Sequence, residues 1–277
     1  MAEKFSVAIR SDAYKTLINN TLGDPEVARK FIADISSVVS QNAQLQLCEP
    51  GTIVSAGLMA QALNLPLSPT LGFAYVVPYN GKGGNKAQFQ IGYKGLIQLA
   101  QRSGQFQRLG VRSVHEGEYT GQDEFGDDVF KFSHEFDAAP VVGYYAYFVL
   151  NNGFKKTLYM TKEQATAHGK RYSRAFASGW SGNLWKDQFD LMAEKTVLKL
   201  LLNRYAPLSV EMQKAVQADQ AVIGSDGSYT YVDNEPEEAP ARSTVKTTII
   251  PEQPVKEITP QPDSDGVFTE EDAERLF

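Results

Sequence analysis

The stretch FQIGYKGLIQLAQRSG, residues 89–104, changes its periodicity halfway along. Up to Ile91, apolar and polar residues alternate, which predicts a strand with one apolar face and one polar, basic face. The apolar residues are Ala87, Phe89 and Ile91, and the polar residues are Lys86, Gln88 and Gln90. From Tyr93 to Arg102 the apolar residues recur at helical spacing, and Gly104 supplies a helix stop. The stretch therefore predicts a strand that leads directly into an amphipathic helix.

The two faces of this helix differ in chemistry. Four residues are predicted to point inward: Tyr93, Leu96, Ile97 and Ala100. Four others are predicted to face outward: Lys94, Gln98, Gln101 and Arg102. The outer face therefore combines cations with neutral amides, and it is free of carboxylates.

The segments around this stretch predict further helices and antiparallel strands. On the N-terminal side we expect helices at residues 24–39 and 52–63, a strand at 73–77 and a flexible hairpin tip at 79–85. On the C-terminal side we expect an extended run at 105–114, an acidic loop at 116–128 and strands at 141–150 and 154–159. A capping box formed by Thr161 and Gln164 starts a helix to about residue 176, and a long helix follows at 185–205.

Charge is unevenly distributed along the chain. Residues 1–220 have a net charge of +3 and residues 221–277 a net charge of −9, which together give the −6 of the whole chain. After about Val222 the composition turns to Pro, Glu, Ser, Thr and Asp, which cannot bury enough apolar surface to offset ordering. We therefore expect one domain at residues 1–222 and a disordered acidic tail at 223–277.

Several classes of protein are disfavoured by composition. The single cysteine, Cys48, excludes an intramolecular disulfide, and three histidines in separate segments make a zinc site improbable. The start of the chain does not resemble a signal peptide, and there is no run of about 18 apolar residues, so we expect an intracellular protein without a membrane span. The Gly81–Gly84 tip lacks the pattern of a nucleotide-binding P-loop. We expect neither a cofactor nor an enzyme.

Two long segments contain no Asp or Glu, although the chain as a whole is acidic. They run from Pro50 to His115 and from Gln164 to Lys186. Both contain cations interleaved with Asn and Gln, a combination that suits phosphate oxygens without reading bases. Aromatic residues among these cations could stack on nucleobases: Tyr79, Tyr93, Tyr172, Phe176 and Trp180. These segments indicate a surface for a polyanion, and nucleic acid is the simplest candidate.

Two motifs resemble the RecT family of phage single-strand annealing proteins. The first is residues 89–104, and the second is Trp185-Lys186-x-x-Phe189-x-x-Met192-Ala193-x-Lys195-Thr196-x-x-Lys199, followed by Tyr205-Ala206-Pro207-Leu208-Ser209. The resemblance covers roughly residues 25–215. It implies an α+β fold, in which a small antiparallel sheet packs on a long helix with additional helices. It also implies distant similarity to phage λ Redβ.

The function implied by this resemblance is ATP-independent annealing of complementary DNA strands in recombination. The implied assembly is a ring or helical filament that binds single-stranded DNA and the annealed duplex intermediate. The implied partners are a 5′-to-3′ exonuclease and the host single-strand binding protein, in the cytoplasm of a bacterium that carries the phage or prophage.

The DNA-contacting residues are predicted in two groups. Cations that match the family motifs are Lys94, Arg102, Lys186, Lys195 and Lys199. Residues added from charge and placement are Lys82, Lys86, Tyr93, Gln98, Arg108, Arg112, Lys170, Arg171, Arg174 and Arg204. Lys195 and Lys199 also form a row with Asn203 that could instead pair with neighbouring helices, and both interpretations remain open.

Three alternatives accompany this hypothesis. A metal-dependent enzyme acting on nucleic acid could use Asp123, Glu124, Asp127 and Asp128. A structural, self-assembling protein could use the apolar helix at residues 25–41. The tail could carry an amphipathic peptide at residues 268–277 that binds a partner protein, could compete with DNA for the basic groove, or could only solubilise the chain.

Overall fold

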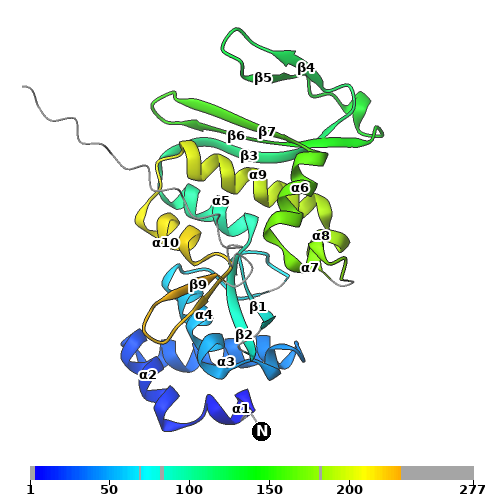
Figure 1. Cartoon of the computed structure of the whole chain (residues 1–277). Coiled ribbons are helices and arrows are strands. Elements are labelled where there is room, and N and C mark those ends of the chain that lie inside the picture. Colours follow the sequence, from blue (N-terminus) through cyan, green and yellow to red (C-terminus); the bar gives the residue numbers. More distant parts are fainter. Residues whose placement is uncertain (1–3, 69, 82–83, 181–182, 232–277) are drawn as a thin grey trace, which may run out of the picture. The chain divides into compact units, whose positions relative to one another are not determined.

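The computed structural model describes residues 4–68, 70–81, 84–180 and 183–231 (Figure 1). Helices and antiparallel strands are combined in this part of the chain, which confirms the predicted α+β class. Lys82 and most of the acidic tail, including the peptide at 268–277, lie outside the described residues. The tail's predicted disorder and its three possible roles therefore stay predictions.

A three-stranded antiparallel sheet packs on the longest helix, as predicted. Its order is β3 (Phe106–His115), β6 (Val141–Leu150) and β7 (Lys155–Thr161), with β6 in the centre. The helix is α9 (Phe189–Tyr205), and Figure 1 shows it along one face of this sheet. Alternate residues of β6 are buried toward the helix, namely Tyr144, Ala146, Phe148 and Leu150. They meet a continuous apolar face of α9 made of Ala193, Val197, Leu198, Leu201 and Leu202.

A second antiparallel sheet contains the strand of the first motif. Its order is β1 (Ala74–Gly81), β2 (Gly84–Ile91), β8 (Ala221–Ile223) and β9 (Tyr229–Tyr231). The predicted apolar face of β2 is confirmed, because Ala87, Phe89 and Ile91 are fully buried. Helix α10 (Val210–Ala218) leads into β8 and returns the chain to β2, where Phe89 pairs with Ala221.

Helices precede the strands of this second sheet in the chain. They are α1 (Phe5–Ala8), α2 (Asp12–Leu22), α3 (Pro25–Ser40) and α4 (Pro50–Ala62). The Asp24 carboxylate caps α3 by accepting a hydrogen bond from the Glu26 amide at 2.7 Å, and Pro25 occupies the first turn as predicted. The apolar face of α3 is buried within the chain, in part against Gly57 of α4, so Phe31 and Ile35 serve the core.

Helix α5 (Tyr93–Arg102) begins immediately after β2 and packs unusually close to the segment before β1. A Cβ placed on Gly92 would lie 2.0 Å from the Gly72 carbonyl oxygen, and one on Gly95 would lie 2.2 Å from the Phe73 carbonyl oxygen. Both glycines are therefore required by backbone contact. The predicted inner face is correct for Leu96 and Ala100, which are buried, whereas Tyr93 and Ile97 are half-buried and Leu99 takes a core position instead.

The structure differs from the sequence predictions at several boundaries. The hairpin tip predicted at 79–85 is mostly paired strand, because β1 continues to Gly81 and β2 begins at Gly84. The helix predicted at 161–176 divides at Ser173 into α6 (Lys162–Tyr172) and α7 (Arg174–Ala177). The helix predicted at 185–205 divides at Gln188 into α8 (Leu184–Asp187) and α9. The predicted loop at 116–128 contains β4 (Tyr119–Gln122) and the start of β5 (Asp128–Phe130). Regular structure extends beyond residue 222, because β8 and β9 pair with each other.

Replacing Gly95 by alanine tests the close contact of α5. Alanine normally stabilises a helix interior by about 1 kcal/mol relative to glycine. Here we expect destabilisation of about 1–3 kcal/mol, because the added methyl group would overlap the Phe73 carbonyl. Urea unfolding measures this, with Gln101→Ala at an exposed position of the same helix as the matched control. A Gly95→Ala chain as stable as the unsubstituted protein would contradict this packing.

Candidate nucleic-acid interface

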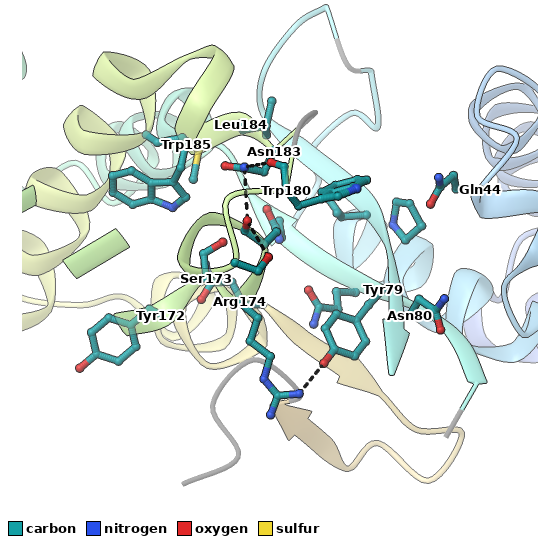
Figure 2. Close-up of a pocket in the computed structure, with 18 residues that line it drawn as sticks. Gln44, Tyr79, Asn80, Tyr172, Ser173, Arg174, Trp180, Asn183, Leu184 and Trp185 are labelled. Atoms are coloured by element: carbon teal, nitrogen blue, oxygen red, sulfur yellow. Dashed lines mark hydrogen bonds between the residues drawn. The ribbon is translucent and has the colours of Figure 1, made fainter. Parts of the chain in front are cut away.

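A cleft with a volume of about 810 Å³ lies between strands β1 and β2 and the segment that runs from α6 to α9 (Figure 2). Polar residues of one wall come from the two strands and include Tyr79, Asn80, Gln88 and Gln90. The opposite wall includes Tyr172, Arg174, Trp180 and Trp185, with Met192 of α9 behind them. None of the described residues that line the cleft is an aspartate or a glutamate. The cleft thus joins the two acid-free sequence segments.

A hydrogen bond joins the two walls at one end of the cleft. The Arg174 guanidinium donates from Nη1 to the Tyr79 hydroxyl at 3.1 Å (Figure 2). Ser173 caps α7 through its hydroxyl, which accepts from the Phe176 amide, and this cap starts the short helix that carries Arg174. The break between α6 and α7 therefore aims an exposed guanidinium at the strands.

Asn183 positions the loop that carries Trp180. Its side-chain nitrogen donates to the Trp180 carbonyl, and its side-chain oxygen accepts from the Lys186 amide at 3.1 Å, which caps α8. The Trp180 ring remains 54% exposed although its backbone is held in place. A fixed backbone with an exposed indole suits stacking on a base, because little of the ordering cost remains to be met at binding.

The floor of the cleft contains a buried amide, that of Gln88. Its burial shows that the prediction of an exposed polar face for β2 is wrong at this residue. Gln88 was expected on a polar, outward face, but it is only 2% exposed. Its side-chain nitrogen has no hydrogen-bond partner among the described residues. An unpaired buried donor carries a free-energy cost, and an acceptor in the cleft reaches this nitrogen only if neighbouring side chains move aside.

A smaller pocket of about 230 Å³ adjoins the cleft and shares Tyr172, Trp185, Met192 and Gln220 with it. It is lined by two of the three lysines of the second motif, Lys195 and Lys199, and by His168. Burial lowers the pKa of the His168 imidazole, and the charges of Lys199 and Arg171 lower it further. These cations create a positive potential in the pocket.

The row that contains Lys195 and Lys199 does not lie on an open surface, because both lysines bind Asp219. Lys195 Nζ lies 3.3 Å from Asp219 Oδ1, and Lys199 Nζ lies 2.5 Å from Asp219 Oδ2. Asp219 Oδ1 also accepts from the Ile91 amide at 3.1 Å. Lys195 is 9% exposed and Asp219 is 2% exposed. The sequence left two interpretations of this row open, contact with DNA and pairing within the protein. The structure supplies a pairing partner, Asp219, which the sequence analysis did not identify.

The charge state of Asp219 follows from these contacts. Burial raises the pKa of its carboxyl, but the two lysine charges and the hydrogen bonds outweigh burial and hold the pKa below its ordinary value. The carboxylate is therefore ionised, and the three groups together retain one positive charge. That charge faces the smaller pocket.

Two other predicted cations also have protein partners. Arg102 donates to the Leu63 and Asn64 carbonyl oxygens, each at 2.8 Å, and so binds the C-terminal end of α4. Arg112 pairs with the buried Glu118 carboxylate at 3.0 Å and lies 4.0 Å from the centre of the Phe132 ring. Both guanidinium groups support the fold directly.

The remaining predicted residues are distributed over several surfaces. Lys170 and Arg171 are exposed at the end of α6, beside Tyr172, and Lys186 is exposed on α8, beside Trp185. Lys86 pairs with Tyr79 across the β1–β2 ladder. Lys94 is exposed on α5, whereas Tyr93 and Gln98 are half-buried. Arg204 lies at the end of α9, and Arg108 lies on β3. The structure thus gathers only part of the predicted set near the cleft.

The acidic carboxylates proposed for a metal have other contacts. Asp127 pairs with Lys156, while Asp123 accepts from the Phe125 and Asp127 amides. Asp128 accepts from the Tyr119 hydroxyl and from the Gln122 amide. Across the described ranges, no group of three or more His, Cys, Asp or Glu residues could hold a metal ion.

A search of the same ranges for a helix with the length and apolar character of a membrane span finds none.

Comparisons with known proteins identify the family of the chain. A family model described as the RecT family matches residues 29–240. Protein YqaK of Bacillus subtilis (strain 168), described as uncharacterized, is 39% identical over 215 residues, which cover 76% of this chain and 72% of the relative. Protein RecT of Escherichia coli (strain K12) is 32% identical over 226 residues, which cover 76% of this chain and 81% of the relative.

Replacing Asp219 by asparagine tests its structural role. The substitution leaves the buried Lys195 charge and the half-buried Lys199 charge without a counter-ion, so we expect a loss of about 3–5 kcal/mol in the free energy of unfolding. Asp34→Asn, at an exposed position of α3, is the control and should change stability little. The folded pKa of Asp219 is depressed, so its contribution is full above the ordinary value of 3.8 and is lost as the pH falls further.

The difference between the two chains should therefore stay constant from neutral pH to about pH 5 and shrink at lower pH. Denaturant unfolding at several pH values measures it. Equal stability of the Asp219→Asn chain and the unsubstituted chain at neutral pH would contradict the role given to this carboxylate.

Proposed function

The chain belongs to the RecT family, and on that premise we propose that it binds single-stranded DNA and anneals complementary strands without ATP. The family is one of DNA single-strand annealing in phage-type recombination. The observation that supports a DNA site in this chain is the carboxylate-free cleft of about 810 Å³, with an exposed indole, a guanidinium and several amides on its walls.

Each wall group has a separate part in holding a strand. Arg174 contacts a phosphate, and Lys170, Arg171 and Lys186, each within two positions of an aromatic cleft residue, add to the positive field. Trp180 and Tyr172 stack on bases, an interaction available to every base because each has a π-face. The amides of Gln88 and Gln90 bind sugar or phosphate oxygens. These contacts hold a strand without selecting its sequence.

This binding mode permits annealing because it leaves the base edges of the bound strand exposed. Two strands repel each other through their phosphates, and cations of the protein reduce that repulsion. When one strand is held by phosphates and by stacking, Watson–Crick edges remain able to test a second strand. Sequence selection then belongs to base pairing, and the protein supplies charge and alignment.

The triad of Lys195, Asp219 and Lys199 supports the site in this proposal. It connects α9 to the Ile91 amide of β2, and both of these elements line the cleft or its adjoining pocket. Its single excess positive charge adds to the attraction for a phosphate in the smaller pocket. The two lysines thus act mainly by holding α9 against β2 and by their electrostatic field. Only Lys199, with 25% of its side chain exposed, is accessible to DNA.

The wider setting is proposed from the family resemblance. We place the chain in a ring or helical filament, which aligns many short sites along a strand. Its proposed partners are a 5′-to-3′ exonuclease that generates single strands and the host single-strand binding protein. The proposed location is the bacterial cytoplasm.

The first prediction of this proposal concerns salt. If six or more phosphates are contacted per binding unit, affinity for a long single strand should fall about 300-fold or more between 50 and 200 mM salt, because about 0.7 is added to the salt slope per phosphate contact. Fluorescence anisotropy of a labelled oligonucleotide measures it. Binding that is indifferent to salt would count against a phosphate-based site.

The second prediction concerns the cleft itself. Trp180→Ala should weaken binding to every single-stranded sequence by about 1–3 kcal/mol, and Arg174→Gln should weaken it and lower the salt dependence. Lys214→Gln, on the exposed side of α10, is the matched charge control and should bind as the unsubstituted chain does. A loss confined to one sequence would instead indicate base readout.

Annealing of long complementary oligonucleotides, with no nucleotide added, tests the proposed activity. The chain should accelerate duplex formation, and Trp180→Ala and Arg174→Gln should slow it in proportion to lost binding. Divalent metal is included in a parallel reaction with labelled DNA. Cleavage there that disappears on substitution of Asp127 and Asp128 would favour the metal-dependent enzyme over the annealing protein.

A further inference from the structure

The face of the β3–β6–β7 sheet that points away from α9 has an unexpected composition. None of the three strands contains an aspartate or a glutamate. Because Tyr144, Ala146, Phe148 and Leu150 are buried toward α9, the residues between them point to the opposite side. Figure 1 shows the β4–β5 hairpin on that opposite side of the sheet.

The strand register places cations and an aromatic ring in two adjacent rows of this outer face. Val149 of β6 pairs with Arg108 on one side and with Lys155 on the other. Tyr147 pairs with Gly110 on one side and with Thr157 on the other. Neighbouring strands are about 4.8 Å apart, so the Arg108 and Lys155 backbones flank the central strand at a separation of about 10 Å.

The Tyr147 ring lies flat on the sheet because Gly110 leaves room for it. A Cβ on Gly110 would come within 2.8 Å of the Tyr147 ring atoms. A glycine inside a strand weakens the strand, and this one makes room for a ring that lies across β3. Tyr147 also stacks on Tyr145, with ring centres 5.9 Å apart and planes inclined by 26°.

The hairpin covers only one end of this aromatic row. Phe130 of β5 lies 4.7 Å from the ring centre of Tyr145 and 5.1 Å from that of Tyr159. Tyr119 of β4 stacks on Tyr159 at 5.8 Å. Tyr147 is the last ring of the row and contacts neither hairpin ring, so its partly exposed face is open next to the two cations.

The cations in this open half differ from the other cations of the sheet. Arg112 pairs with Glu118, and Lys156 pairs with Asp127. Arg108 and Lys155 are both exposed, and within the described ranges neither forms an ion pair. Two unneutralised cations beside an open tyrosine ring, on strands without carboxylates, form a polyanion-binding surface that also accepts a flat apolar group.

We propose that this outer sheet face is a second site for single-stranded nucleic acid, in which Arg108 and Lys155 bind phosphates and Tyr147 stacks on a base. This face lies on the side of the sheet opposite α9 (Figure 1), whereas the cleft is lined by Met192 of α9 and by the segment from α6 to α8, so the two sites hold separate strands. A strand on this face is separated by the sheet and α9 from a strand in the cleft of the same subunit, so its binding does not depend on the annealing function proposed above.

The experiment separates the two strands by label and by order of addition. The chain is first saturated with one labelled oligonucleotide, and a second, non-complementary oligonucleotide with another dye is then added, so base pairing contributes nothing. Energy transfer between the dyes reports the ternary complex. The variants are Arg108→Gln with Lys155→Gln, Tyr147→Ala, and the conservative Tyr147→Phe, with Lys214→Gln as the matched charge control.

The proposal expects a selective loss. The double glutamine variant should bind the first strand with unchanged affinity, whereas the salt slope for the second strand should fall by about 1.4, because about 0.7 is lost per phosphate contact. Tyr147→Ala should weaken second-strand binding by about tenfold, and Tyr147→Phe should restore it, since stacking needs the ring and not the hydroxyl. Circular dichroism and first-strand affinity verify folding.

Three results would overturn the proposal. Equal loss of first-strand and second-strand binding in the double variant would make the sheet face part of a single site. Unchanged second-strand binding would remove the sheet face from DNA binding, while the cleft, tested by Trp180→Ala, would stand or fall separately. A change in sedimentation with intact second-strand binding would assign the face to contact with a second copy of the chain.

Discussion

A single buried carboxylate holds together the elements on which the candidate site depends. Asp219 contacts Lys195 and Lys199 of α9 and the backbone amide of Ile91 at the end of β2. Burying any one of these charges alone would carry a large desolvation cost. In the triad, the negative charge of Asp219 offsets that cost for the lysines, and the lysines offset it for Asp219. Strand β2 forms the floor of the cleft and α9 supplies Met192 behind it, so the position of the cleft walls depends on this contact.

The distribution of charge has a simple structural meaning. The acid-free sequence segments come together as the two walls of the cleft, where no carboxylate is found among the described lining residues. Cations that face carboxylates in this chain, such as Arg112 and Lys195, stabilise the fold. Cations without such partners, such as Arg108 and Lys155, are left for solvent or for a polyanion. The division between structural and available cations therefore depends on tertiary pairing and cannot be counted from composition.

Much of the fold could be predicted from the sequence because its signals are local. The Asp24-Pro25 start of α3, the Thr161–Gln164 capping box of α6 and the alternation in β2 each involve residues only a few positions apart. The breaks at Ser173 and Gln188 were missed because apolar periodicity continues across them. The burial of Gln88 was missed because alternation assigns it to the outer face, and only the opposite wall covers it. Asp219 could not be matched to Lys195, since 24 residues and a complete helix separate them in the chain.

The central claim is that bases stack on an exposed indole in the cleft. The chain has two tryptophans, Trp180, which is 54% exposed, and Trp185, which is 6% exposed and packs against Phe176. Titration of single-stranded DNA into the chain, followed by tryptophan emission, therefore reports on the cleft directly. We expect strong quenching that saturates with binding and is the same for different base compositions. This quenching should disappear in Trp180→Phe. Full binding of DNA with unchanged tryptophan emission would contradict the central claim.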